Sequence, residues 1–537
     1  MSDADPREQW FLTPAERANP DTDIDRRRGG NRAYTEGNLA LPHVHGANYF
    51  ARLLEVILGL SDGDWIHFTD WRGDADERLG GPGTEIVRVL GDAAKRGVEV
   101  RGLVWRSHPH QAKFSEQESL HFAKTINDAG GQVLLDERVR RGGSHHQKLF
   151  LIRKPDKENS DIAFVGGIDL CHSRHDDAEH KGDPQAWEMN EAYGPTPAWH
   201  DIQLEITGPA VGDLAATFRE RWDDPAPLDH RNPWRIAIAR RVGQPRHPDP
   251  LPDMPDDPDP TGPHALQVLR TYPKKSHLAY PFAREGERSI ARAYIKALRR
   301  ARKLIYVEDQ YFWSEEIAAS LADALESQPT LRLIALVPLV PEQQGVMSET
   351  PEHLGQRKAW DIVRAVGGER VALYGVQNDA GRPIYIHAKA CIIDDVWAMV
   401  GSDNLNRRSW THDSELSCAV LDDTMDEREP LDPGGLGDRA RQFARNLRLS
   451  LWEEHLGRAA RGFDLVDPEK GFEAWASAAE QLKRWKTTDR TEPMPTRVVR
   501  HLPPPVPRHH RLWSEAAYRL LVDPDGRPRS VRKRKTF

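Results

Sequence analysis

A short pattern of reactive side chains occurs twice in this chain, and the repetition restricts the folds that the chain can adopt. In the second copy, His387-Ala388-Lys389 precedes an apolar run and Gly401-Ser402-Asp403-Asn404. In the first copy, His146-Gln147-Lys148 precedes a similar run and Gly166-Gly167-Ile168-Asp169. The second pattern arises by chance with a probability on the order of 10⁻⁵ in a chain of ordinary composition. We therefore interpret the two copies as the halves of an internal duplication.

The segments around the two copies correspond as well. Helical patterns are expected at residues 49–60, 85–96, 290–301 and 317–326, and β-rich runs at 64–71, 98–105, 304–311 and 331–338. Strands that alternate with helices of this length are typical of an α/β domain with a mixed sheet. We expect a duplicated fold of two α-β-α sandwich lobes, whose mixed β-sheets face one central cleft that holds both histidines.

Composition divides the rest of the chain. Residues 223–263 are rich in Pro and Asp and predict a linker between the copies. The expected parts are an N-terminal arm (1–45), a first lobe (46–222), the linker (223–263), a second lobe (264–460) and a C-terminal extension (461–537). The extension ends in the basic run Arg532-Lys533-Arg534-Lys535. Short basic runs are usually solvated, and the alternative is attraction to anionic lipid.

Several features predict a cytoplasmic protein. No apolar stretch approaches the ~20 residues that span a bilayer, and the first residues lack the basic and apolar regions of a secretory signal. The three cysteines suggest neither a disulfide framework nor a metal site. His108, His110 and His121 are too scattered for a zinc site. The net charge of -8 does not favour nucleic acid as a partner.

The repeated histidines and lysines suit the cleavage of a phosphodiester. Imidazole has a reference pKa of ~6.5, so it can act as a nucleophile or as a proton donor near neutral pH. One histidine can attack phosphorus while the other protonates the leaving alcohol. The ammonium groups of two lysines can neutralise the non-bridging oxygens, a role that metal ions take in other phosphodiesterases.

The second copy matches the pattern H-x-K-x4-D-x6-G-S-x-N, and it resembles the signature of the phospholipase D superfamily without a mismatch. In the first copy Arg153 stands where the superfamily has Asp, and Gly166-Gly167-Ile168-Asp169 resembles the first motif of eukaryote-type phospholipases D. Trp199-His200-Asp201, the segment 306–312 and the segment 451–457 resemble further elements of the plant and animal enzymes. The resemblance covers the chain from about residue 49 to residue 457.

The resemblance implies a mechanism without metal or cofactor. It assigns His146 as the nucleophile and His387 as the acid and base, although the near-symmetry of the site also permits the reverse. Lys148 and Lys389 would neutralise the phosphate. The residues expected at the phosphate oxygens are Ser402, Asn404 and Gly167.

Each catalytic imidazole needs an acceptor that fixes its tautomer. The resemblance places Glu415 beside His387, and Asp176 or Asp177 beside His146. The alternative for the paired Asp is an exposed loop turn.

The remaining polar positions of the motifs are expected to support the site. Asp394 belongs to the signature, but it directly follows a buried-strand pattern and should bond backbone or lysine at a turn. A longer hairpin could satisfy that turn differently in the first copy, which would make Arg153 tolerable. Asp169 could bind phosphate only when protonated, so it is expected to be structural. His200 and Asp201 either support the site or form a histidine–aspartate pair in the core.

These observations predict a phospholipase D that cleaves the distal phosphodiester of a glycerophospholipid and contacts the membrane surface through loops or the basic tail. We expect no appended lipid-targeting domain, because few residues precede the first lobe. One alternative is a phosphatidyltransferase of the cardiolipin or phosphatidylserine synthase type. The others are a nuclease of the superfamily and a binding protein that has lost its activity. The sequence does not predict an oligomeric state.

Overall fold

The computed structural model describes residues 5–30, 32–106, 116–155, 160–228, 244–344, 346–534 and 536–537. The first half contains α4 (Gly46–Leu58), β2 (Trp65–Asp70), α5 (Ile86–Lys95), β3 (Glu99–Trp105), α6 (Glu116–Asp128), β4 (Gln132–Asp136), β5 (Leu149–Arg153), β6 (Ile162–Gly166), β7 (Ala198–His200), β8 (Ile202–Thr207) and α7 (Ala210–Trp222). It is preceded by α1 (Pro6–Trp10), α2 (Pro14–Arg17), α3 (Asp23–Arg26) and β1 (Thr35–Val44).

The second half repeats this order. It contains β9 (His264–Tyr272), β10 (Glu287–Arg288), α9 (Ser289–Arg300), β11 (Leu304–Glu308), α10 (Glu315–Ser327), β12 (Arg332–Leu336), α11 (Val346–Gly367), β13 (Val371–Val376), β14 (Ile384–Ile386), β15 (Ala390–Ile393), β16 (Trp397–Gly401), α12 (Arg407–Thr411), β17 (Glu415–Asp422) and α13 (Gln442–Leu456). It is followed by α14 (Pro468–Trp485), β18 (Val498–Arg500), α15 (Arg511–Ala517) and α16 (Arg529–Lys533). The helices and strands predicted around the two motifs are confirmed.

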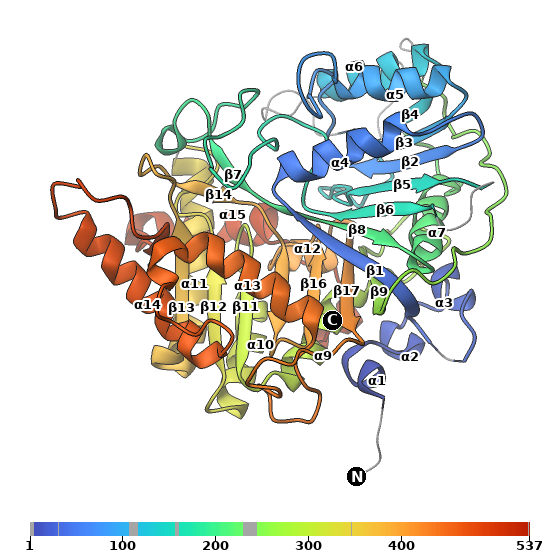
Figure 1. Cartoon of the computed structure of the whole chain (residues 1–537). Helices are drawn as coiled ribbons and strands as arrows, with labels where there is room; N and C mark the ends of the chain where they lie inside the picture. Colours follow the sequence, from blue (N-terminus) through green and yellow to red (C-terminus); the bar gives the residue numbers. More distant parts are fainter. Residues whose placement is uncertain are drawn as a thin grey trace.

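One mixed sheet of 16 strands runs through both halves (Figure 1). In the first half β2, β3 and β4 are parallel, and β5 and β6 follow as antiparallel strands. In the second half β11, β12 and β13 are parallel, and β15 and β16 follow in the same way. This shared order supports the predicted duplication.

The strand β1 joins the two half-sheets. It pairs antiparallel with β8 of the first half and with β9 of the second half. Because β9 pairs in turn with β17, β1 and β9 hold equivalent places in the two halves. The segment expected to be an N-terminal arm therefore supplies a central strand of the sheet.

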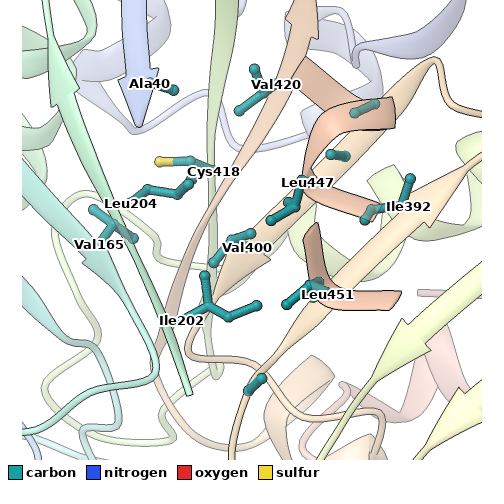
Figure 2. Packing of buried hydrophobic residues seen from close by; sticks show 14 of the residues in the cluster. Ala40, Val165, Ile202, Leu204, Ile392, Val400, Cys418, Val420, Leu447 and Leu451 are labelled. Carbon is teal, nitrogen blue, oxygen red and sulfur yellow. The ribbon is translucent and has the colours of Figure 1, made fainter. Parts of the chain in front are cut away.

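Helices cover both faces of this sheet. On one face α4, α5 and α6 pack against the first half, and α9, α10 and α11 pack against the second half. On the opposite face α7, α13 and α14 share one hydrophobic cluster that extends across both halves. In Figure 2 residues of β1, β6 and β8 meet residues of β15, β16, β17 and α13 within this cluster.

Alternation along the strands directs side chains to the two faces. Ala163 and Val165 of β6 face the cluster shared by both halves, whereas Ile162 and Phe164 face the helices α4, α5 and α6. Successive side chains of a strand point to opposite faces, so the continuous apolar run of β6 indicates a strand that is covered on both sides.

The C-terminal segment also packs against the body of the molecule. The strand β18 pairs antiparallel with β13, and α14 begins at Asp467, whose side chain accepts a hydrogen bond from the Glu469 amide. The ring of Phe537 contacts the ring of Trp410 at a centroid distance of 5.2 Å. Of the predicted basic tail, Arg532 and Lys533 lie in α16, and Lys535 lies outside the described residues. Within the described ranges, no helix combines the length and the apolar character needed to cross a bilayer.

Candidate active site

Two short pairings between the halves bring the repeated motifs together. The strand β7 of the first half runs parallel to β14 of the second half, and the His387 amide donates to the carbonyl of His200 at 2.8 Å. In the mirrored arrangement, His145 bridges Ser414, and the His146 amide donates to the carbonyl of Ser414 at 2.9 Å. Each motif is thus held by a segment of the other half.

The imidazole of His146 is oriented by a carboxylate from the second half. Its Nδ1 lies 2.9 Å from Oε2 of Glu415. The hydroxyl of Ser402 donates to the same Oε2 at 2.5 Å and accepts from the Leu416 amide at 3.0 Å. The Trp71 ring contacts the edge of the imidazole at a centroid distance of 6.1 Å. This arrangement directs Nε2 of His146 away from its carboxylate, where it is available for chemistry.

The imidazole of His387 is oriented by a carboxylate from the first half. Its Nδ1 lies 2.6 Å from Oδ2 of Asp201. A Cβ atom at Gly167 would lie 2.1 Å from Oδ1 of Asp201, so this glycine leaves the space that the carboxylate occupies. The rings of Trp199 and Tyr385 flank the imidazole at centroid distances of 4.9 and 6.3 Å.

The expected pairing of histidines and carboxylates is wrong. Glu415 bonds His146, not His387, and the acceptor of His387 is Asp201. The physical reason is that Glu415 begins β17 and Asp201 precedes β8, and both strands lie near the join of the half-sheets, where each reaches the motif of the other half. The duplication itself carried a signal, because Asp201 and Glu415 stand at equivalent strand starts.

The expected role of the paired aspartates is also wrong. The carboxylate of Asp176 accepts hydrogen bonds from the amides of Trp199 and Gly182. The carboxylate of Asp177 accepts from the Glu179 amide. Both carboxylates stabilise the loop after β6, which agrees with the alternative of a loop turn, although Asp176 is buried.

The two lysines are buried beside their histidines. Nζ of Lys148 donates to the His146 carbonyl at 3.0 Å, and Nζ of Lys389 donates to the His387 carbonyl. Burial and the charge of Lys148 lower the pKa of Lys389 to about 8, although Asp201 acts in the opposite direction. Burial, with the charges of Lys389 and Arg174, holds the pKa of His387 well below its usual value, so this imidazole is neutral in the free protein.

Asp169 has a structural role. Its carboxylate lies 3.3 Å from Nζ of Lys148 and 3.2 Å from the guanidinium of Arg174. Burial alone would raise the pKa of Asp169, but these two cations hold it well below its usual value. Burial and the charge of Asp169 raise the pKa of the neighbouring Asp70. Asp169 is therefore ionised and holds Lys148 in place through their ion pair, whereas Asp70 is protonated. No separate feature of the sequence pointed to these roles of Asp70 and Arg174.

Two of the three groups expected at the phosphate oxygens are occupied elsewhere. The single hydroxyl proton of Ser402 is donated to Glu415, and the Gly167 amide donates to the Ile202 carbonyl at 3.1 Å. Phosphate contacts of these two residues stay a prediction, and each would require the group to leave its present partner. Asn404 is buried, and its side-chain NH2 group can donate to a phosphate oxygen, so Asn404 stays a candidate.

Asp394 lies at the far end of β15 from Lys389. It occupies a tight hairpin in which Asp394 and Asp395 both have positive φ angles of 52° and 57°, a conformation that Asp tolerates. Its carboxylate accepts from three consecutive amides, those of residues 302–304, at 2.7 to 2.8 Å. This geometry agrees with the structural role expected for Asp394 and gives it no place among the catalytic groups.

Arg153 takes over a structural function in the first copy. Its Nε donates to Oδ2 of Asp161 at 2.5 Å, and the Lys154 amide donates to the other oxygen at 2.6 Å. The longer hairpin between β5 and β6 thus closes with an ion pair instead of a turn aspartate.

We expect Arg153→Ala to lower stability and to spare catalysis. Loss of the guanidinium leaves the buried Asp161 without its partner, which costs roughly 1–3 kcal/mol. The denaturant midpoint should fall, while kcat/KM per folded molecule stays within about threefold of the parent, since Arg153 touches no reacting group. A variant that is folded but as inactive as a histidine variant would contradict this assignment.

His200 lies behind Asp201. Its Nε2 is 2.7 Å from Oε2 of Glu308, whereas Oδ1 of Asp201 accepts from the Ile202 amide. His200 is therefore a buried histidine that is paired with a carboxylate, but the carboxylate belongs to Glu308 and not to Asp201 as the alternative proposed. His108 and His110 lie outside the described residues, and His121 lies on α6.

A small cavity of about 30 Å³ is lined by Tyr385, whose ring flanks the imidazole of His387. Its walls include Gln310, whose Oε1 lies 3.4 Å from Nζ of Lys389, and Tyr385, which stacks on the imidazole. The other aromatic and acidic side chains of the wall are Tyr311, Trp313, Glu342 and Glu352. Burial and the charges of two neighbouring glutamates raise the pKa of Glu352 to about 8. The pocket is thus aromatic and acidic.

Comparisons with known proteins find sequences and a structure that are similar to this chain. A sequence model described as phospholipase D matches residues 84–331 and 368–502, and one described as "Cardiolipin synthase, PLD-like domain" matches residues 294–428. The chain is 26% identical over 536 residues to phospholipase D alpha 2 of Oryza sativa subsp. japonica, covering 75% of this chain and 63% of that protein. It is 26% identical over 561 residues to phospholipase D alpha 1 of Ricinus communis, covering 82% and 66%.

The chain thus spans slightly less than two thirds of the length of these curated relatives. Among solved structures, phosphatidylserine synthase of Haemophilus influenzae Rd KW20 superposes with a TM-score of 0.50 at 14% identity. That superposition covers 72% of this chain and 84% of the synthase, and it shows a shared fold.

Proposed function

Because the chain belongs to the phospholipase D family, whose sequence model matches most of its length, we propose that it hydrolyses the distal phosphodiester of a glycerophospholipid. The products are phosphatidate and the free head-group alcohol. The observation that carries this proposal is the pair of mirrored units, His146 with Glu415 and His387 with Asp201. Lys148 and Lys389 lie beside these units and supply the positive charge that a phosphodiester requires.

The proposed reaction proceeds in two steps. Nε2 of His146 attacks phosphorus while the bond to the head-group oxygen breaks, and His387 gives its proton to the departing alkoxide. Water then gives a proton to His387 and attacks the phosphohistidine, which releases phosphatidate and restores His146. Since His387 is neutral in the free protein, it must take up its proton when the anionic substrate binds and raises its pKa.

The role of each histidine can be tested directly. With a soluble phosphatidyl ester of an acidic phenol, the leaving group needs no proton, so the His387→Ala variant should form a phosphoenzyme and hydrolyse it slowly. Peptide mass spectrometry should then locate the phosphate on His146. A phosphate found on His387 in the His146→Ala variant would reverse the assignment.

One side-by-side assay tests the proposed function. Phosphatidylcholine, cardiolipin and single-stranded DNA are offered with and without ethanol, and phosphatidate, phosphatidylethanol and nucleotides are measured. Phosphatidate from phosphatidylcholine supports the proposal, and phosphatidylethanol shows that alcohol can replace water. Transfer to an alcohol without any hydrolysis would favour the phosphatidyltransferase, which the match to the cardiolipin synthase model makes the second candidate. Cleavage of DNA alone would overturn the lipid proposal.

The pKa of Lys389 predicts an alkaline limit of activity. With a pKa of about 8, this lysine is protonated below pH 8 and loses its charge as the pH rises further. The value of kcat/KM, which reports the free enzyme, should therefore fall about tenfold per pH unit well above pH 8. A short-chain soluble substrate keeps lipid aggregation out of the measurement. A profile that is flat to pH 10 would contradict the prediction.

The aromatic rings and carboxylates beside His387 suit a head group with a positive charge. Aromatic faces and carboxylates attract ammonium groups, and a quaternary ammonium gains most from the aromatic faces. We expect Glu342→Gln, which changes a carboxylate that lines this cavity, to raise KM for phosphatidylcholine severalfold and to change KM for phosphatidylglycerol much less. Competition between the two lipids in mixed micelles measures this ratio. An equal change for both lipids would place the head group elsewhere.

Contact with a lipid surface is part of the proposal. Leu520 and Leu521 are among the most exposed large apolar side chains, at 73% and 71%. The neighbouring Arg519 carries positive charge on the same turn. Exposed leucines beside a cation are suited to a membrane interface, so this turn and α16 are the proposed points of contact.

A further inference from the structure

Three histidines and one glutamate converge behind the His387 half-site. His45 precedes α4, His180 lies in the loop after β6, His200 ends β7, and Glu454 lies in α13. One nitrogen of each imidazole and one carboxylate oxygen all lie within 4.8 Å of one another. The three histidines are at most 2% exposed.

The distances between these atoms fit the coordination shell of a metal ion. Oxygens of Glu454 lie 2.8 Å from Nε2 of His45, 3.1 Å from Nε2 of His180 and 3.6 Å from Nδ1 of His200. Zinc bonds of ~2.0–2.1 Å in a tetrahedral arrangement put neighbouring ligand atoms about 3.3 Å apart. The observed distances bracket this separation, and the longest is too long for a hydrogen bond.

His200 is arranged as a ligand that is fixed from behind. Its Nε2 lies 2.7 Å from Oε2 of Glu308, to which it donates. Nδ1 is buried, has no hydrogen-bond partner among the described residues and lies 3.6 Å from an oxygen of Glu454. A cation, either a metal ion or a proton on Nδ1, is needed between this nitrogen and the carboxylate. Histidines that bind metals commonly donate their other nitrogen to a carboxylate in this way.

The charge of the cluster is compatible with a bound cation. Glu454 is hydrogen-bonded to His45 and His180, and Glu308 to His200, His455 and Tyr306. Within the described part of the chain, no lysine or arginine is hydrogen-bonded or ion-paired to either carboxylate. Two buried carboxylates that have only histidines as basic partners are costly unless a cation is present, and one divalent ion would balance both charges.

The backbone is distorted where two of these histidines are placed. His45 and His180 have positive φ angles of 72° and 55°. Such conformations are uncommon for residues other than glycine and persist where the surrounding structure imposes them. Here they direct both imidazoles toward Glu454.

We propose that His45, His180, His200 and Glu454 bind one divalent ion of the zinc class. The donor set of imidazoles and a carboxylate suits zinc better than magnesium or calcium, which take oxygen ligands. The ion joins β7 and the loop after β6 to α13, and so connects the two halves of the molecule. The carbonyl of His200 holds the His387 amide, and Asp201 follows directly. The ion therefore positions the His387 half-site without touching the phosphate.

Metal content tests this site without reference to activity. The protein is expressed with added zinc, dialysed against buffer without metal, and analysed by mass spectrometry for first-row transition metals. We expect about one equivalent of zinc per chain, and X-ray absorption should show four nitrogen or oxygen ligands at about 2.0–2.1 Å. A total metal content below about a tenth of an equivalent per chain would overturn the proposal. The cation of the cluster would then be a proton on His200.

Variants distinguish the cluster from surface binding. His180→Gln should lose most of the zinc, and His43→Gln should retain it. His43 is a matched control because it also bonds a glutamate, Glu205, but lies outside the cluster. Equal zinc content in the parent and in a folded His180→Gln variant would overturn the assignment. If that variant does not fold, the X-ray absorption spectrum of the parent tests the assignment instead. A metal bound only by sulfur or only by water oxygens would overturn the assignment.

Discussion

Replacing either His146 or His387 with alanine lowers kcat by at least about 10⁴-fold, because the two groups act as one unit and the loss of either removes a whole step. The double variant should be only slightly worse than either single variant. The measurement is the release of head-group alcohol from a soluble substrate, with circular dichroism to confirm folding. His172→Ala is the matched control, since this partly exposed histidine bonds Asp76 and lies outside both motifs.

The same experiment tests whether both motifs are active. A His146→Ala variant that retains more than about a hundredth of the activity would show that one half-site suffices, since losses of this kind are otherwise far larger. That outcome would contradict the two-step mechanism. It would also remove the reason for the mirrored geometry around Glu415 and Asp201.

The local features of the fold were predictable from the sequence. The strands β2 and β11 and the helices that flank them follow from short apolar runs and helical periodicity, which depend on neighbouring residues. The histidines and lysines of the site were predictable for a different reason. The duplication places them at equivalent positions, and the chemistry of phosphodiester cleavage needs both.

The partners of these residues were not predictable from local pattern. The bond between His387 and Asp201 joins residues 186 positions apart, and the bond between His146 and Glu415 joins residues 269 positions apart. Such contacts depend on how the half-sheets join, which β1 and β9 determine. The family resemblance suggested Glu415 for His387, but the exchange of segments across the join gives Glu415 to His146. For the same reason the hydrogen bond from Ser402 to Glu415 was not predictable.

The second large effect is expected from the crossed carboxylates. Asp201→Asn and Glu415→Gln should each lower kcat/KM by about 10²- to 10⁴-fold, because each amide removes the charge that steadies an imidazolium and can favour the wrong tautomer. Asp176→Asn is the matched control, since its carboxylate bonds backbone amides instead of a catalytic ring. It should cost stability and leave kcat within about tenfold of the parent.

The step that fails identifies which histidine each carboxylate serves. With a phenolic leaving group that needs no proton, Asp201→Asn should still form the phosphoenzyme and then accumulate it, with the phosphate on His146, because only the His387 unit is impaired. Glu415→Gln should form little phosphoenzyme at any time, since the nucleophile has lost its partner. Accumulation in Glu415→Gln with phosphate on His146 would mean that Glu415 serves His387 and that the crossed pairing is wrong. Accumulation in Glu415→Gln with phosphate on His387 would agree with the crossed pairing but exchange the roles of the two histidines. The position of the phosphate therefore distinguishes a wrong pairing from exchanged roles.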